Sequence, residues 1–193
     1  DALTHAIEAY TSRMANPMSD AQALHAIRLI AQNLETAVKD PRNLAARTQM
    51  QSAATLAGWA IGSASVGLVH GMCHALGARH GGAHGGGNGI LLPHVIRFNA
   101  VTPQAAARLK DVAAALGADT AGRSPGDAAE AAAVRVSGLL KATGHPVRLA
   151  QVKIPREDLA ACAETAFIDQ ANLTNGRRVG SPAEIEALYE AAW

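Results

Sequence analysis

The chain of 193 residues is poor in aromatic residues and contains only two cysteines. Phe, Trp and Tyr make up 3% of it, and Cys73 and Cys162 are too few for a disulfide framework, which fits a reducing cytosol. No apolar run approaches the roughly 18 residues that span a bilayer, and no signal or transit peptide is visible. These absences predict a cytoplasmic protein that does not contact a membrane.

An excess of charge of one sign is also missing. Lys and Arg number 17 against 16 Asp and Glu, giving a formal net charge of +1, which excludes the basic surface required for sequence-independent nucleic-acid binding. With 49% hydrophobic and 17% charged residues, the composition is not that of a disordered chain. The length is sufficient for one or two domains with a real core.

Alanine, the best helix former, is abundant, and apolar residues recur at helical spacing. Ser19 and Asp20 offer a cap for the second helix, Pro41 predicts the start of the third, and Gly62 marks a break in it. No alternating strand pattern competes over a useful length. We predict an all-α fold with helices over residues 1–14, 19–39, 41–60, 67–78, 90–98, 103–116, 126–143, 155–168 and 182–192.

Two pairs of residues with metal-ligand spacing lie on predicted helices. Asp1 and His5 are four residues apart, so a helix places the carboxylate and the imidazole on one face. His70 and His74 repeat this spacing with two imidazoles, the usual way in which a helix offers nitrogen ligands.

His84 follows ten residues after His74, within the glycine-rich residues 81–89. We interpret this segment as a loop that lets His84 fold back toward His70. It follows no predicted strand and has neither the GxGxxG spacing nor the lysine of a phosphate-binding loop, so it does not predict a nucleotide site. One carboxylate and three imidazoles would make a four-ligand shell for Zn²⁺ or Fe²⁺.

A structural interpretation of the same histidines stays open, in which they satisfy hydrogen bonds in a polar cleft of a helical domain. His80 and His94 fit a structural or surface role, and His25 and His145, outside the cluster, receive no role.

Several segments together resemble one known family, the iron-containing (group III) alcohol dehydrogenases. The resemblance covers the whole chain, and its first two motifs are highly specific. The segments that carry it are residues 1–10 (DALTHAIEAY), 67–77 (GLVHGMCHALG), 84–85 with Asn88, 90–94 (ILLPH), 175–177 (NGR) and 185–189 (IEALY).

The resemblance implies the fold and the domain organisation. It implies that residues 1–193 form one helical metal-binding catalytic domain, the C-terminal half of a two-domain enzyme with a dehydroquinate-synthase-like fold. The N-terminal α/β nucleotide-binding domain would lie upstream, and this chain alone would be inactive. Dimers are common among such relatives, so a homodimer is expected.

The resemblance also implies the site and the reaction. The metal ligands would be Asp1, His5, His70 and His84, holding Fe²⁺ or Zn²⁺, and His74 would lie near the nicotinamide and the substrate as a catalytic and cofactor-binding residue. NAD(P) would be bound mainly by the absent domain. The expected reaction is hydride transfer between an alcohol and an aldehyde or ketone, with the metal polarising the substrate oxygen.

Some residues depart from the family pattern and keep alternatives open. Gly176 replaces the usual Pro, and Ala171 occupies a neighbourhood where some relatives carry Cys. The pair Cys73 and His74 resembles that of the maleylacetate reductases, a metal-independent sister group, although Asp1 and the pair His84-Gly85 favour the metal-dependent branch. A further alternative is a non-catalytic metal-binding or interaction module.

Overall fold

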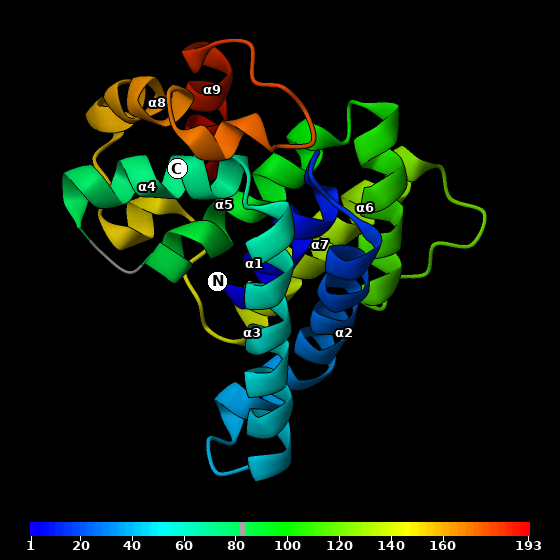
Figure 1. Cartoon of the computed structure of the whole chain (residues 1–193). Helices are drawn as coiled ribbons and strands as arrows, with labels where there is room; N and C mark the ends of the chain where they lie inside the picture. Colours follow the sequence, from blue (N-terminus) through cyan, green and yellow to red (C-terminus); the bar gives the residue numbers. More distant parts are fainter. Residues whose placement is uncertain (82–83) are drawn as a thin grey trace.

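The computed structural model describes residues 1–81 and 84–193, which fold into α-helices and short 3-10 helices (Figure 1). No strand occurs in these residues, so the predicted all-α fold is confirmed. The α-helices are α1 (Ala2–Thr11), α2 (Pro17–Lys39), α3 (Leu44–Ala64), α4 (Leu68–His80), α5 (His84–Asn99), α6 (Pro103–Ala115), α7 (Pro125–Ala142), α8 (Leu159–Phe167) and α9 (Pro182–Ala192), and the 3-10 helices are η1 (Leu149–Val152), η2 (Arg156–Asp158) and η3 (Gln170–Leu173).

Helices α2 and α3 form a long antiparallel pair that projects from the rest of the molecule, with α1 packed against both (Figure 1). The inward face of α3 is a row of alanines at helical spacing, all fully buried: Ala53, Ala57, Ala60 and Ala64. Because each of these side chains is a single methyl group, neighbouring helices can approach closely. The abundance of alanine in the sequence therefore reflects close helix packing.

The start of α2 differs from the prediction because the cap is Asn16 rather than Ser19. The side chain of Asn16 accepts hydrogen bonds from the backbone N–H of Met18 and Ser19, both at 3.1 Å. Ser19 Oγ in turn accepts the N–H of Asn16 at 3.0 Å. This reciprocal arrangement satisfies donors that the first helical turn leaves free, so the helix begins at Pro17.

The bounds of α3 also differ from the prediction. Its cap is Asn43, whose side chain accepts the N–H of Ala46 at 3.0 Å, whereas Pro41 lies in the preceding turn. At the other end the helix continues through Gly62 to Ala64. Burial of Ala60 and Ala64 outweighs the low helix propensity of glycine.

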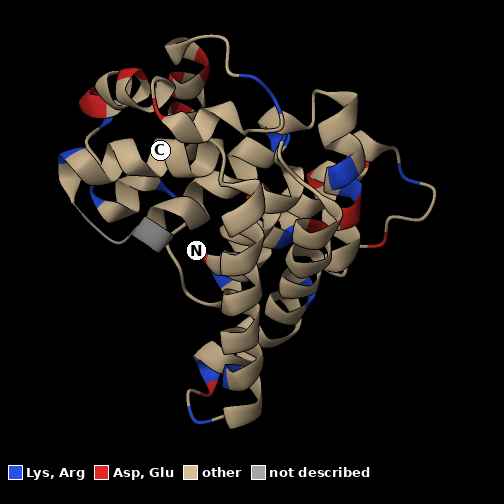
Figure 2. Ribbon diagram, viewed as in Figure 1, with Lys and Arg blue, Asp and Glu red and all other residues tan. Residues whose placement is uncertain are grey.

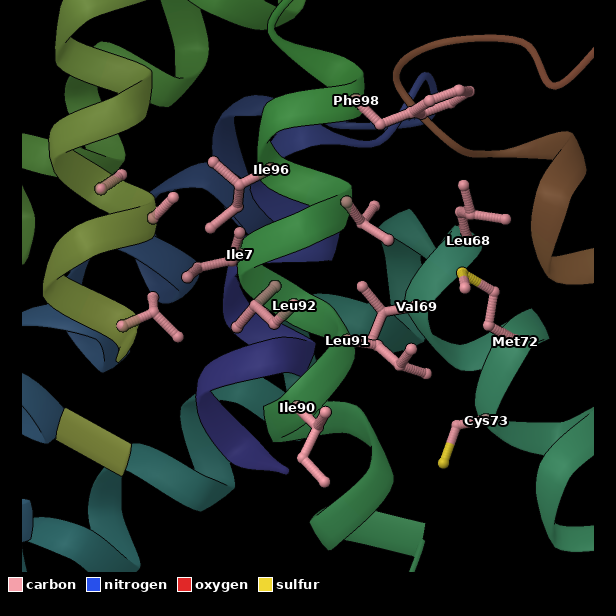
Figure 3. Close-up of a cluster of buried hydrophobic side chains, with 14 of the residues drawn as sticks. Ile7, Leu68, Val69, Met72, Cys73, Ile90, Leu91, Leu92, Ile96 and Phe98 are labelled. Carbon is pink, nitrogen blue, oxygen red and sulfur yellow. The ribbon is translucent and has the colours of Figure 1, made fainter. Parts of the chain in front are cut away.

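Helix α5 lies at the centre of the core, with α4 on one side and α1 and α7 on the other (Figure 3). Its buried face contributes Ile90, Leu91, Leu92, Val95 and Ile96. The helix begins at His84, with Pro93 inside it, so the prediction of a loop over residues 81–89 is wrong for 84–89. Residues 82 and 83 lie outside the part of the chain that the structure describes.

Two glycines explain how this segment can be helical. A Cβ atom on Gly87 would lie 2.7 Å from Cys73 Sγ of α4, and one on Gly89 would lie 3.0 Å from Leu140 Cδ2 of α7. Both distances are shorter than ordinary contacts between carbon or sulfur atoms. The two glycines therefore allow α5 to pack closely against its neighbours. By sequence alone, the same glycines indicate part of a loop.

The C-terminal part of the chain is fastened to α4 and α5 by buried polar contacts. Tyr189 of α9 donates its hydroxyl hydrogen to the carbonyl of Met72 at 2.6 Å, and the side-chain amides of Asn99 and Asn175 bond each other reciprocally at 3.2 and 2.8 Å. Gly176, where the family resemblance leads us to expect proline, would place a Cβ atom 2.6 Å from the carbonyl oxygen of Thr11. In this structure the two segments approach too closely to leave room for a Cβ atom at this position.

Charged residues of both signs are scattered over the outer helices and loops (Figure 2). In the described part of the chain no single helix is long and apolar enough to cross a membrane. Helices α3 and α4 taken together are long and apolar enough for a span, but the chain bends by 101° between them.

Candidate metal centre

Three potential metal ligands meet where the start of α1 faces α4. Asp1 precedes the first residue of α1, His5 lies one turn further along, and His70 lies near the start of α4. Asp1 Oδ1 is 3.8 Å from His5 Nε2 and 3.7 Å from His70 Nε2. One ligand atom of each of the three residues lies within 4.8 Å of those of the others.

The imidazole of His70 is buried and held by a buried carboxylate. Glu8 of α1 accepts a hydrogen bond from His70 Nδ1 at 2.5 Å through one oxygen and from the backbone N–H of Val69 at 2.6 Å through the other. An imidazole that donates from Nδ1 carries its lone pair on Nε2. Glu8 thus fixes the tautomer in which His70 can offer Nε2 toward Asp1.

Gly67 makes this contact possible. A Cβ atom at this position would lie 2.9 Å from Asn175 Oδ1 and 3.1 Å from Glu8 Oε1. Asn175 Oδ1 also accepts the backbone N–H of Leu68 at 3.3 Å. Two side chains far apart in sequence therefore satisfy the first N–H groups of α4, and the absence of a side chain at Gly67 leaves room for both.

Asn88 of α5 completes the polar surroundings of the ligand atoms. Its Nδ2 donates to Asp1 Oδ1 at 2.9 Å and lies 3.2 Å from His70 Nε2. Asp1 Oδ1 and His70 Nε2 thus both direct a lone pair toward the NH₂ group of Asn88.

The donor set fits a divalent cation. Carboxylate oxygen and neutral imidazole nitrogen are ligands for Zn²⁺ and for Fe²⁺, and four-coordinate zinc with bonds of about 2.0 Å separates its ligand atoms by about 3.3 Å. The separations of 3.7 and 3.8 Å between Asp1 Oδ1 and the two imidazole nitrogens are close to that value. The rings of His5 and His70 lie almost parallel, with centroids 4.7 Å apart, and each brings a nitrogen to the ligand group.

The fourth predicted ligand, His84, is the first residue of α5. Its side chain lies outside what the structure describes. The structure therefore brings together Asp1, His5 and His70, and the assignment of His84 stays a prediction.

His74 lies one turn beyond His70 on α4 and is not a member of the ligand group. Its ring stands edge-on to that of His70, with centroids 6.1 Å apart, and its side chain is 47% exposed. Its Nδ1 lies 2.9 Å from Asp169 Oδ2. The catalytic and cofactor-binding role that the resemblance implies for His74 stays a prediction.

The neighbouring cysteine has a different character. Burial raises the pKa of the Cys73 thiol to about 11, so the group is neutral near pH 7. A neutral thiol is a poor nucleophile and a poor ligand. Cys73 packs with the apolar side chains of α4 and α5 (Figure 3).

Histidines outside the ligand group have partners of their own. His80 Nε2 lies 3.5 Å from Asp158 Oδ2, and His145 Nδ1 donates to the carbonyl of Pro146 at 2.7 Å. Burial, with Arg97 and Arg148 nearby, lowers the pKa of His94.

Three polar residues around the site received no role in the sequence analysis. Glu8 lies three residues after His5, so helical spacing places both on neighbouring parts of α1 and could have indicated a link. Asn88 is among the residues that carry the family resemblance, but helical spacing did not link it to the histidines, nor did it link Asp169 to them. Only the packing of α5 and η3 against α4 brings these two residues to the histidines.

Fold and site together define an all-helical domain with a candidate metal centre of one carboxylate and two imidazoles, set between its first helix and a central helix pair. The chain belongs to the Fe-containing alcohol dehydrogenase family, because residues 1–193 match the C-terminal domain of that family. The resemblance found in the sequence motifs is thereby confirmed.

Several named proteins are similar to this chain. The 1,3-propanediol dehydrogenase of Klebsiella pneumoniae is 42% identical over 194 residues, and the lactaldehyde reductase of Escherichia coli is 37% identical over 193 residues. Each alignment covers 100% of this chain and 49% of the relative. The chain therefore spans about half the length of these relatives.

Solved structures agree with this relationship. A crystal structure of a 1,3-propanediol oxidoreductase superposes with a TM-score of 0.96 at 41% identity, covering 100% of this chain and 50% of that one. A maleylacetate reductase from a Rhizobium species superposes with a TM-score of 0.81 at 27% identity, again over 100% and 50%.

Proposed function

We propose that this chain is the helical, metal-binding half of an NAD(P)-dependent alcohol dehydrogenase that interconverts an alcohol and an aldehyde or ketone. The observation that carries the proposal is the convergence of Asp1, His5 and His70, with Glu8 holding the tautomer that His70 needs as a ligand. Family membership and the names of the relatives support the class of reaction.

Asp1, His5 and His70 would hold the cation, with His84 as the fourth ligand. A cation bound there would supply Lewis-acid stabilisation for negative charge that develops on the substrate oxygen. The carboxylate of Asp1 offsets part of the positive charge, and Glu8 adds a second negative charge behind His70.

His74 would touch the substrate or the nicotinamide beside this centre. Its half-exposed imidazole lies one turn from His70, so it could accept or return the proton of a substrate hydroxyl, while a bound nicotinamide would supply the hydride chemistry. A catalytic base must be within hydrogen-bond reach of the proton that it takes, so this role requires the substrate hydroxyl to lie between the candidate centre and His74.

The nucleotide would be held mainly by a separate N-terminal α/β domain. About half of each relative's length lies outside the alignment with this chain, which is enough for such a domain. Residues 1–193 alone are then expected to bind metal without catalysing hydride transfer. The complete two-domain enzyme is the form in which turnover is measured.

The test is metal binding by three forms of the chain. The wild-type protein is expected to take up about one equivalent of Zn²⁺, measured by calorimetric titration and elemental analysis. His70→Ala is expected to lose tight binding. His25→Ala, which changes an exposed histidine of α2, should bind as the wild type does. Equal binding by wild type and His70→Ala would contradict the proposed site.

A second candidate is a metal-independent reductase like the maleylacetate reductases. The pair Cys73 and His74 and the superposition on the Rhizobium enzyme favour it. The two candidates separate when metal is removed from the complete enzyme. The dehydrogenase loses its turnover and regains it when metal is restored, whereas the reductase keeps its turnover throughout.

A further inference from the structure

Asp169 occupies the turn between α8 and η3 and uses both of its carboxylate oxygens. Oδ1 accepts the backbone N–H of Ala171 at 2.8 Å, which caps η3. Oδ2 lies 2.9 Å from His74 Nδ1. Because the cap fixes the orientation of the carboxylate, the second oxygen has a defined direction toward His74.

The turn that carries Asp169 is pressed against α4. Asn172 donates from Nδ2 to the carbonyls of Ala166 and Phe167 at 2.6 and 3.2 Å, which ties the turn to the end of α8. A Cβ atom on Gly71 would lie 3.0 Å from Asn172 Oδ1 and 3.5 Å from Asp169 Cβ. Gly71 therefore leaves room for the turn, three residues before His74 on the same helix.

Helix α4 thus carries two histidines one turn apart, each with a carboxylate from another element at Nδ1. Glu8 of α1 lies against His70, and Asp169 lies against His74. The pair of Glu8 and His70 is buried. In the other pair the side chain of Asp169 is 24% exposed and that of His74 is 47% exposed.

We propose that Asp169 is a positioning residue for His74. Its carboxylate accepts the Nδ1–H of the neutral imidazole, so the lone pair of His74 lies on Nε2, and it fixes the direction of the ring. The catalytic meaning of this arrangement rests on the proposed function, in which His74 Nε2 exchanges the hydroxyl proton. The tautomer itself does not depend on that function.

The first test reads the tautomer directly. Nitrogen-15 labelled histidine in the 193-residue chain gives ring correlations that distinguish Nδ1–H from Nε2–H, at a pH above the histidine range and with or without Zn²⁺. We expect His74 to be the Nδ1–H form. A wild-type His74 that is mainly Nε2–H would overturn the proposal without any variant.

Asp169→Asn is the informative substitution. An asparagine has one carbonyl oxygen, and if that oxygen keeps the cap on Ala171, its NH₂ group faces His74 Nδ1 and selects the Nε2–H form. The control is Asp158→Asn, which changes a carboxylate 3.5 Å from His80 and should leave the His74 signals unchanged. An unchanged tautomer in Asp169→Asn would overturn the proposal.

The second test uses the complete enzyme. Asp169→Asn is expected to lower kcat by about 100-fold, the range typical of a lost proton-transfer group, with KM changed less than about threefold and metal content unchanged. Asp158→Asn should keep the wild-type kcat. A kcat within about twofold of wild type in Asp169→Asn would refute the positioning role.

The failure of each idea is distinguishable. A wild-type chain that takes up no Zn²⁺ contradicts the proposed function, and the tautomer measurement then still decides the role of Asp169. Metal bound normally with His74 in the Nε2–H form contradicts only the role of Asp169.

Discussion

Glu8 combines full burial, two hydrogen bonds and direct contact with a candidate ligand. Glu8→Gln keeps the shape but leaves one accepting oxygen for two donors, Val69 N–H and His70 Nδ1–H. We expect Zn²⁺ affinity to fall about 10- to 100-fold, as is usual when the partner of a ligating histidine is changed. Calorimetric titration measures this.

The control for this variant is Glu35→Gln. Glu35 lies on the exposed face of α2 and pairs with Lys39 at 2.5 Å, so its loss should leave Zn²⁺ affinity unchanged. An affinity of Glu8→Gln equal to that of the control would show that Glu8 does not orient His70.

His94 gives a prediction for the pH dependence of stability. Its pKa in the folded chain is below the ordinary 6.5, through burial first and then the charges of Arg97 and Arg148. As the pH falls below about 6.5, His94 takes up its proton in the unfolded chain before it does so in the folded chain. The free energy of unfolding therefore decreases with falling pH until the pKa of His94 in the folded chain is reached. Urea unfolding across this window should show the loss of stability, and His94→Gln should reduce it. An equal slope in both proteins would contradict the assignment.

At the scale of elements, Gly176 and Gly138 make a matched pair. Gly176→Ala would bring a Cβ atom to 2.6 Å from the carbonyl of Thr11, and we expect a loss of about 1–3 kcal/mol in the free energy of unfolding. Gly138 lies on the exposed face of α7, with no atom within 4 Å of an added Cβ, so Gly138→Ala should gain about 0.5–1 kcal/mol. Urea unfolding measures both, and a stabilised Gly176→Ala would contradict the account of that contact.

Periodicity in the sequence was sufficient to predict the helices, since each buries one apolar face. Their ends were harder, because the caps are single side chains such as Asn16 and Asn43, which compete with equally plausible neighbours. The start of α5 could not be predicted from propensity. Glycine disfavours helix in isolation, and only the contacts of Gly87 and Gly89 with α4 and α7 make it the residue that fits.

For the molecule as a whole, the spacing of Asp1 and His5 and of His70 and His74 was enough to locate the candidate centre. The spacing alone did not decide which of the two histidines on α4 is a metal ligand, because His70 and His74 share one helix face. The assignment of His70 came from the family resemblance. The carboxylates at their Nδ1 atoms come from α1 and from the turn before η3, which are distant in sequence, so only tertiary structure places them.

The central claim is that Asp1, His5 and His70 hold a divalent cation. The most direct measurement is the thermal unfolding of the purified chain before and after treatment with a chelator, together with its content of iron and zinc. We predict about one equivalent of metal and a lower Tm after chelation, because a cation at 100 times its Kd stabilises the folded state by about 2.7 kcal/mol. A chain that contains no metal, takes up none from excess Zn²⁺ and keeps the same Tm throughout would contradict the account.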